Sequence, residues 1–275
     1  MEFRDKFSFS VLMSIYIKEK PNNLRECLDS ILSQSVECDE IIIVEDGILT
    51  DDLYKVIDEY KRKFNKIRTY QFEENVMLGR ALAKGVELCK YDLIARMDTD
   101  DICLPNRFEK QLKFLKDNPD ITVVGGSIIE FDPNTNIELI KNMPTDYYTI
   151  KKYVKFRNPM NHMTVMFRKG EILAAGNYKH WPYLEDYYLW SRLIVRGEKL
   201  CNIAEPLVRV RVDNNLYKRR GGIKYFKTYL RLRREQFNIG LLDKKELVFS
   251  IFFTSIITLI PSNFRKVLYK KYLRK

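Results

Sequence analysis

Short apolar runs alternate with longer amphipathic segments over the first part of the chain, and this alternation restricts the fold more than any other feature. Four runs have the length and composition of buried strands: Phe7–Ile17, Glu40–Val44, Ile67–Phe72 and Leu93–Met97. Three segments between them carry apolar side chains at helical spacing: Leu24–Gln34, Asp52–Lys63 and Gly79–Cys89. Strands that alternate with helices predict an α/β fold with a doubly wound, mostly parallel sheet.

The rest of the chain is less regular and divides at about residue 215. We predict helices at Arg107–Asn118 and Asp186–Arg196, strands at Thr122–Phe131 and Val165–Arg168, and an edge strand at Leu207–Val212. Residues 1–215 are therefore expected to form one domain, followed over residues 216–275 by a basic, aromatic and helical segment. With 275 residues, 45% of them apolar, the chain can form one large core with such an appendage.

The positive charge of the chain is concentrated at its C-terminal end. The formal net charge is +11, and residues 216–275 alone hold 16 Lys or Arg and 3 Asp or Glu, which gives +13. The first 215 residues therefore sum to −2. A local positive field of this kind indicates an anionic partner for the C-terminal segment, such as lipid headgroups, a diphosphate or nucleic acid.

Cysteine usage and hydropathy indicate a cytoplasmic protein. The five cysteines are odd in number and scattered without a C-x-x-C pair, which favours reduced thiols. The N-terminus, MEFRDKFSFS, has no apolar core after a basic start, so we expect no signal peptide. No apolar run reaches the roughly 18 residues that a transmembrane helix needs, so we predict none.

Three carboxylates follow the fourth predicted strand: Asp98, Asp100 and Asp101. In an open α/β sheet, ligands bind at the C-terminal ends of the strands. Carboxylates this close repel one another unless protons or a cation neutralise them. Mg²⁺ and Mn²⁺ both accept carboxylate oxygens, and either ion neutralises the charge of a diphosphate leaving group. The alternative is a solvated acidic turn that caps the next helix.

The segment IARMDTDDICLPNRFEKQ, which is Ile94–Gln111, resembles the signature of glycosyltransferase family 2 in its bacterial O-antigen and exopolysaccharide branch. The resemblance spans about Phe9 to Val212, and the motifs follow the family's order. It implies the GT-A fold, with a nucleotide-binding half over about residues 7–104 and an acceptor-binding half over about residues 105–215.

Three segments of the first half match segments that contact the donor nucleotide in this family. Tyr16 occupies the turn after the first strand, although the family's Pro and Asn are absent there. Asp46, in the sequence VEDG, is the implied acceptor for the uracil N–H. Arg80 and Lys84 lie on a glycine-flanked helix that is similar to the one passing over the nucleotide, and either side chain is a candidate for the diphosphate.

The resemblance also assigns roles within the acidic cluster. Asp100 corresponds to the metal ligand, and Asp98 to a contact with the ribose or with the metal through water. Asp101 is expected to organise the loop or to contact the donor sugar, while Arg96 pairs with these acids.

Two later positions complete the implied donor and metal site. His162 stands where the family often has a small polar residue or His near the acceptor or the metal, although a lone His is often structural. Arg211 resembles a late arginine near the diphosphate.

The sequence YLEDYYLW, which begins at Tyr183, is similar to the start of the family's acceptor helix. Inverting transfer needs one general base for the acceptor hydroxyl, and Asp186 is the candidate, with Glu185 orienting it or gripping the acceptor. Tyr187 and Trp190 offer flat faces for a sugar ring. The alternative is that the acids only stabilise the helix N-terminus and that Trp190 belongs to the core.

The run Leu247–Ile260 is apolar, and basic residues flank it: Lys244, Lys245, Arg265 and Lys266. It is too short to span a bilayer, and its pattern suits an interface with anionic lipid at the cytoplasmic face. The alternative is a helix buried against the catalytic domain or in a dimer. The preceding Tyr217–Arg234 is a candidate for holding the acceptor's diphosphate.

The resemblance as a whole implies a metal-dependent, inverting hexosyltransferase. It would move galactose or glucose from a UDP-sugar to a sugar-diphosphate-undecaprenol acceptor, with a β-linkage, in O-antigen and lipopolysaccharide synthesis. A sugar nucleotidyltransferase would need a glycine-rich loop after the first strand, and none is present. A nucleic-acid-binding protein acting through its basic tail would leave both acidic clusters without a role, so we expect no nucleic acid partner.

Overall fold

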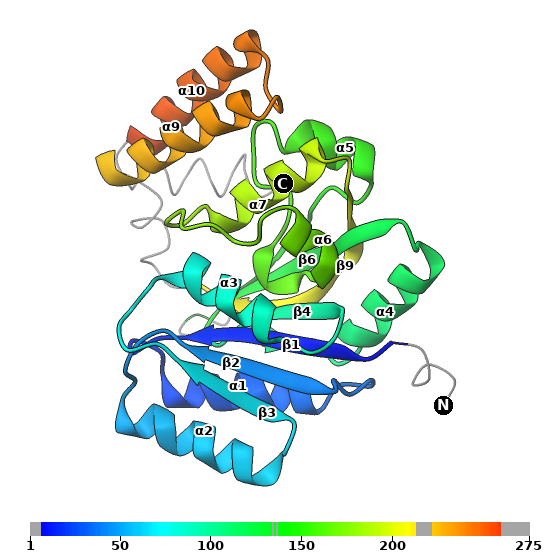
Figure 1. Ribbon diagram of the computed structural model, residues 1–275, viewed down its shortest axis with the longest axis vertical. Helices are drawn as coiled ribbons and strands as arrows, with labels where there is room; N and C mark the ends of the chain where they lie inside the picture. Colours follow the sequence, from blue (N-terminus) through cyan, green and yellow to red (C-terminus); the bar gives the residue numbers. More distant parts are fainter. Residues whose placement is uncertain (1–6, 134, 136, 213–221, 260–275) are drawn as a thin grey trace.

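The computed structural model describes residues 7–133, 135, 137–212 and 222–259 (Figure 1). Its N-terminal half alternates strands and helices as predicted, with boundaries that differ by a few residues. The elements are β1 (Phe9–Ile15), α1 (Pro21–Leu32), β2 (Glu40–Glu45), α2 (Asp51–Lys63), β3 (Ile67–Gln71), α3 (Leu78–Leu88) and β4 (Leu93–Asp98).

The second half adds shorter elements and two long strands. The strands are β5 (Ile102–Cys103), β6 (Ile121–Asp132), β7 (Ile137–Lys141), β8 (Met166–Arg168) and β9 (Lys199–Arg211). The helices are α4 (Arg107–Asp117), α5 (Tyr147–Tyr153), the 3₁₀ helix η1 (His162–Thr164), α6 (Lys169–Ala174) and α7 (Glu185–Val195). Several of these are too short for a hydrophobic period to develop, so β5, β7, α5 and α6 were not predicted.

All nine strands of the described residues join one sheet, in the order β3-β2-β1-β4-β8-β6-β9-β5, with β7 paired to β6. The first four strands are parallel, as predicted for the nucleotide-binding half. Strand β8 then runs antiparallel to both β4 and β6, while β6 and β9 are parallel to each other. The predicted α/β class is confirmed, with a mixed sheet in the second half.

The prediction of an edge strand at Leu207–Val212 is wrong. These residues belong mostly to the C-terminal part of β9, which lies between β6 and β5. Pro206 interrupts the sequence pattern, but the strand continues through it. The register against β6 shifts nearby, between Gly126 and Ser127.

Two hydrophobic clusters cover the two faces of the sheet. Val11 and Met13 pack with α1, α2 and α4 on one face, whereas Leu12 packs with α3 and α7 on the other. Side chains alternate between the faces of a strand, so β1 contributes to both clusters. Strands buried on both faces read as continuous apolar runs, which is why β1 and β2 were recognisable.

The chain ends, as far as it is described, in a helical hairpin of α9 (Ile223–Asn238) and α10 (Lys244–Leu259), at the top of Figure 1. This is the predicted helical extension, although residues 213–221 and 260–275 lie outside the described residues. Within the described part of the chain, no helix combines the length and the apolarity needed to cross a bilayer. All five cysteines are buried and free, in keeping with the predicted reduced thiols.

Candidate active site

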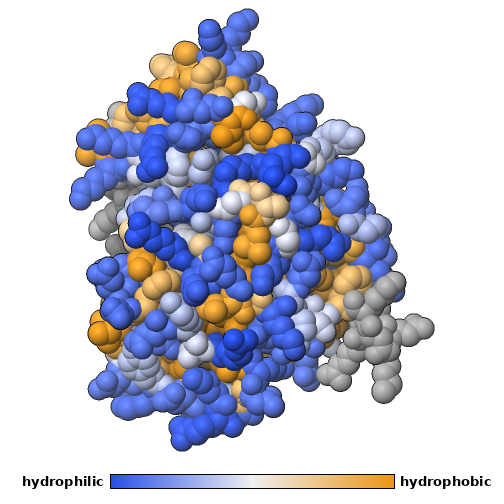
Figure 2. All heavy atoms as spheres, in the orientation of Figure 1, coloured by the Kyte–Doolittle hydropathy of each residue, from blue (hydrophilic) through white to orange (hydrophobic). Residues whose placement is uncertain are grey.

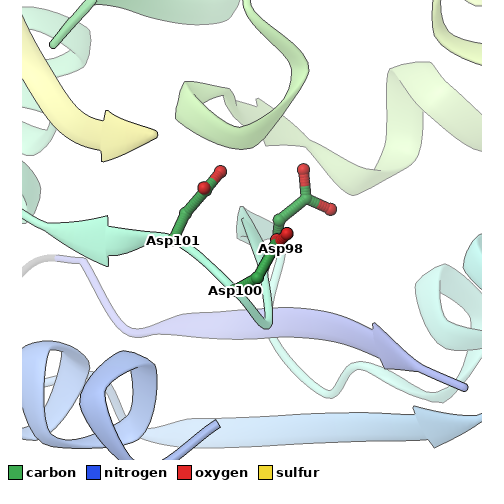
Figure 3. A group of neighbouring side chains, drawn as sticks. All are labelled: Asp98, Asp100 and Asp101. Carbon is green, nitrogen blue, oxygen red and sulfur yellow. The ribbon is translucent and has the colours of Figure 1, made fainter. Parts of the chain in front are cut away.

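The acidic cluster lies in the turn that follows β4. One carboxylate oxygen from each of Asp98, Asp100 and Asp101 lies within 4.8 Å of the others, and the three side chains point to the same side of the turn (Figure 3). Burial raises the pKa of Asp100 to about 7, and the nearby charges of Asp98 and Glu19 add to this rise. Burial, together with the charges of Asp100 and Asp98, raises the pKa of Asp101 well above its usual range.

These carboxylates fit a hard divalent ion. They supply only oxygen donors, and the raised pKa values of Asp100 and Asp101 indicate that the site needs positive charge or protons to balance the acids. Asp98 and Asp100 are partly exposed and accessible to an ion, whereas Asp101 is buried.

Arg211 holds the acidic turn in place. Its backbone N–H donates to Asp101 Oδ1 at 2.9 Å, and its side-chain Nε donates to the carbonyl of Asp100 at 3.1 Å. Its Nη2 donates to Glu26 at 2.6 Å. In this structure Arg211 therefore contacts the turn itself, and its predicted role at the diphosphate is untested.

A buried arginine supports the turn from behind. Arg107 Nη2 donates to the carbonyl of Arg96 at 2.6 Å, and Arg107 Nε donates to Gln111 at 3.0 Å. Gln111 in turn donates to the carbonyls of Val124 and Thr164, at 3.0 and 2.8 Å. The PxRFxxQ part of the signature thus links β4 to β6 and η1. This structural role was not predicted.

Arg96 forms the predicted ion pair with Asp98 and is almost completely buried. Its Nε and Nη1 atoms have no hydrogen-bond partner among the residues that the structure describes. Burial, together with the positive charge of Arg96, lowers the pKa of His162 well below its usual value. His162 is therefore neutral, and its Nε2 lies 2.9 Å from the hydroxyl of Tyr178.

This arrangement puts His162 in a buried group with Arg96 and Tyr178. It does not belong to the cluster of ligand atoms formed by the three aspartates. The Tyr178 hydroxyl engages its Nε2 atom, and the predicted position of His162 near the acceptor or the metal stays a prediction.

The second pair of acids lies at the start of α7, where both side chains are buried. Asp186 Oδ2 accepts a hydrogen bond from Asn158 at 2.6 Å, and its Oδ1 accepts one from the backbone N–H of Tyr187 at 2.7 Å. Burial raises the pKa of Glu185 to about 8, and the charge of Asp186 adds to this rise. At neutral pH Glu185 is thus mainly protonated.

The two acidic groups share one electrostatic environment. The charge of Asp98 raises the pKa of Glu185, and the charge of Arg96 lowers it. The pKa of Tyr178 is raised by burial and further by Asp186, Glu185 and Asp98. The structure therefore brings together the two carboxylate groups that the sequence separates by more than eighty residues. The contact of Asn158 with Asp186 and the place of Tyr178 between the two groups were not predicted.

The predicted nucleotide contacts lie near the same end of the parallel strands. Tyr16 directly follows β1 and is exposed, and Arg80 is exposed in the first turn of α3. Asp46 follows β2 and is buried, and its oxygens accept from the Val76 N–H at 2.6 Å and from the Asn75 side chain at 3.1 Å. Asp46 thus fixes the loop before α3.

Tyr187 and Trp190 are fully buried, so neither has an open face on which a sugar can stack. The Tyr187 hydroxyl donates to the carbonyl of Val154 at 2.7 Å and accepts from Arg233 at 3.0 Å. The prediction that these two rings bind the acceptor does not fit this burial. Arg233 belongs to α9, and the sequence motif alone could not reveal that α9 covers this side of α7.

The chain is similar to known glycosyltransferases. The family model described as glycosyl transferase family 2 matches residues 10–173, more than half of the chain. The chain belongs to glycosyltransferase family 2. An uncharacterised glycosyltransferase of Haemophilus influenzae is 40% identical over 268 residues, which are 97% of this chain and 99% of the relative.

A second similar member of family 2 has a described reaction. It is the Escherichia coli UDP-Gal:alpha-D-GlcNAc-diphosphoundecaprenol beta-1,3-galactosyltransferase, 38% identical over 272 residues and 98% of both chains. Among solved structures, S. aureus TarS 1–349 matches with a TM-score of 0.69 at 14% identity, covering 97% of this chain and 75% of that 1–349 chain. This likeness agrees with the predicted GT-A fold.

Proposed function

We propose that this glycosyltransferase moves galactose or glucose from a UDP-sugar to a sugar-diphosphate-undecaprenol acceptor, with inversion to a β-linkage, in surface-polysaccharide or O-antigen synthesis. The observation that carries the proposal is the grouping of three carboxylates at the end of β4 with a second acidic pair, of which Glu185 has a pKa that the charge of Asp98 raises. The E. coli relative, named for a reaction of this kind, supports the choice of donor and acceptor.

The residues at the end of β4 would hold Mn²⁺ or Mg²⁺. In this proposal Asp100 and Asp98 provide the ligand oxygens, and the bound ion supplies positive charge to the diphosphate of the leaving nucleotide. Asp101 and Arg211 keep the turn in position through their hydrogen bond. Tyr16, Asp46 and Arg80 contact the nucleotide part of the donor.

Asp186 acts as the general base. Its carboxylate takes the proton from the acceptor hydroxyl while the hydroxyl oxygen bonds to the anomeric carbon, and the bond from that carbon to UDP breaks with its electron pair leaving on the diphosphate. The hydrogen bonds from Asn158 and the Tyr187 N–H hold this carboxylate in one orientation. Protonated Glu185 donates a hydrogen bond to the acceptor or to Asp186.

The lipid acceptor implies work at a membrane. We place the protein at the cytoplasmic face, as a peripheral membrane protein. The nucleotidyltransferase and nucleic-acid-binding alternatives give way to the family assignment, and a nucleic-acid partner is not part of the proposal.

A donor screen tests the proposed reaction. Purified protein is incubated with Mn²⁺, a panel of UDP-sugars and a synthetic N-acetylglucosamine-diphosphate-lipid, and UDP release is followed with mass spectrometry of the product. We expect transfer from UDP-galactose or UDP-glucose that EDTA abolishes. If no UDP-sugar is consumed while another nucleotide sugar is, the proposed donor is wrong.

Variants separate the two acidic groups. Asp186→Asn should lower kcat by about 10²–10⁴-fold with UDP-sugar binding retained, because only the base is lost. Asp100→Asn should weaken metal binding and transfer together. Asp52→Asn, an exposed acid on α2, is the matched control and should behave as the wild type. Wild-type rates in either of the first two variants would remove the role assigned to that residue.

A further inference from the structure

Helix α10 exposes its most apolar side. Val248, Phe249, Phe252, Phe253 and Ile256 lie on one face of the helix and are 45–69% exposed. In Figure 2, orange surface gathers at the top of the view, where Figure 1 places α9 and α10. A helix of a water-soluble domain normally turns such side chains inward.

The opposite side of α10 is polar and buried. Ser250, Thr254 and Thr258 follow one another at intervals of four residues, and each is at most 7% exposed. The Ser250 hydroxyl donates to the Leu247 carbonyl at 2.9 Å and the Thr258 hydroxyl to the Thr254 carbonyl at 2.7 Å. Small hydroxyl residues on the packed side and large apolar residues on the outer side are typical of helices in an apolar solvent.

The exposed face extends onto the catalytic domain. The rings of Phe249 and Phe156 lie 5.8 Å apart at 90°, and Phe156 is itself 39% exposed. Phe156 lies two residues before Asn158, which donates a hydrogen bond to Asp186. The apolar surface therefore lies two residues along the chain from the hydrogen-bond partner of the proposed base.

Three polar contacts fix the hairpin to this segment. Buried Arg233 of α9 donates to the carbonyls of Phe156 and Lys155, at 2.6 and 2.8 Å. Lys155 forms an ion pair with Glu246 of α10 at 2.6 Å. Because both helices are tied to the same stretch, the outer face of α10 keeps a fixed position relative to Asp186.

Basic residues frame the apolar face. Lys244 and Lys245 are exposed in the first turn of α10, and four more basic residues are exposed on α9: Lys224, Lys227, Arg231 and Arg234. Residues 222–259 hold 7 Lys or Arg and 3 Asp or Glu, a net +4, and the sequence 260–275 adds 6 Lys or Arg and no acid. This charge complements an anionic surface.

We propose that the outer face of α10, together with Phe156, is a lipid-docking surface that inserts into the interfacial layer of an anionic bilayer. The helix lies along the membrane plane, since it is too short and too one-sided to cross it. This surface sets the height of Asp186 above the lipid, where the sugar of a membrane-held diphosphate acceptor is presented. The last step rests on the proposed function, and the docking does not.

Vesicle binding tests the surface directly. The probe is a vesicle of equimolar phosphatidylglycerol and phosphatidylethanolamine, compared with phosphatidylcholine alone. Phe252→Ser with Phe253→Ser should weaken binding to the anionic vesicles roughly tenfold or more, because two inserted aromatic rings are lost. The matched control is Ile137→Ser with Ile140→Ser on β7, two equally exposed apolar residues away from the hairpin, and it should bind as the wild type does.

Equal vesicle binding by the Phe252/Phe253 variant and the β7 control would overturn the proposal. A second outcome would also overturn it: the wild type forms a dimer in light scattering, the variant does not, and neither protein binds vesicles. The face would then bind a second copy of the chain. Unchanged thermal unfolding of the variant shows that the hairpin is still folded.

Two acceptors separate docking from catalysis. The Phe252/Phe253 variant should use a water-soluble, short-chain sugar-diphosphate acceptor at the wild-type rate and lose at least several-fold activity on the same headgroup in vesicles. An equal loss on both acceptors would overturn the positioning role. If neither acceptor is used while the variant still loses vesicle binding, docking stands and the proposed reaction falls.

Discussion

Glu185 and Asp186 are adjacent in sequence, yet their carboxyl groups have different surroundings. Asp186 accepts hydrogen bonds from Asn158 and from the Tyr187 N–H, which suit an ionised group. Burial and the charge of Asp186 hold the pKa of Glu185 at about 8. Two adjacent carboxyl groups held in such different surroundings are a pattern of general acid–base sites.

The raised pKa of Glu185 predicts a dependence of stability on pH. The group ordinarily titrates near 4.5, so folding favours its protonated form. Its stabilising contribution is complete below about 4.5 and is lost as the pH rises toward about 8. We therefore expect the free energy of unfolding, measured in urea without added metal, to fall less between pH 5 and pH 8 in Glu185→Gln than in the wild type. Parallel pH profiles would show that Glu185 is not protonated in the folded protein.

Proton competition at Asp100 predicts that metal binding tightens with pH. The pKa of this carboxyl is about 7, so an ion must displace a proton from it below that pH. The Kd for Mn²⁺ should fall by up to about tenfold per pH unit between pH 6 and 7 and level off above pH 8. Calorimetry in buffers of different ionisation enthalpy would detect the released proton. An affinity that is independent of pH would contradict this account.

The sequence identified the chemical groups of the site better than their contacts. Asp98, Asp100 and Asp101 were found because an acidic cluster after a buried strand is a local pattern. Tyr187 is covered by Arg233, more than forty residues later, so no local pattern could reveal its burial. For the same reason the contact of Arg211 with the acidic turn was beyond sequence reasoning.

Among the elements, α3 connects the nucleotide half of the site with the second acidic pair. A Cβ atom on Gly79 would lie 2.5 Å from the carbonyl oxygen of Lys179 and 3.3 Å from the Cβ of Glu185. The small residue therefore allows the first turn of α3 to approach the segment before α7.

Gly79→Ala should disturb both the fold and the site. The carbonyl of Lys179 belongs to the backbone and cannot move aside cheaply, so we expect a loss of about 1–3 kcal/mol in unfolding free energy and a lower kcat. Gly170→Ala is the control, because its added Cβ would meet only Asp92 Oδ1 at 3.8 Å and should change stability by less than about 0.5 kcal/mol. Equal effects of the two substitutions would contradict this packing argument.

Arg107 and Gln111 predict a coupled effect on the strands behind the acidic turn. Either Arg107→Met or Gln111→Leu leaves buried polar partners unsatisfied. Each substitution should lower the free energy of unfolding by about 2–4 kcal/mol. The double variant should cost at least about 1 kcal/mol less than the sum, because both partners are then removed. Urea unfolding of the four proteins measures this coupling, and strict additivity would show that the pair acts separately.

Over the whole molecule, sequence patterns located the first seven elements and the α/β class, because long buried strands and amphipathic helices have distinct periods. The second half was harder. Its strands pair in both directions, and β9 continues through Pro206 where the pattern breaks. The outward apolar face of α10 could be assigned only once its buried side was known to consist of Ser and Thr.

In the proposed site, the ion at the end of β4 and the base of α7 face the same cleft. The most direct measurement is anomalous diffraction from a crystal grown with UDP and Mn²⁺. We predict a single strong manganese peak in contact with Asp100 or Asp98, with the diphosphate on it and the Asp186 carboxylate facing the same cleft. A peak bound elsewhere, or Asp186 directed away from the nucleotide, would contradict the account.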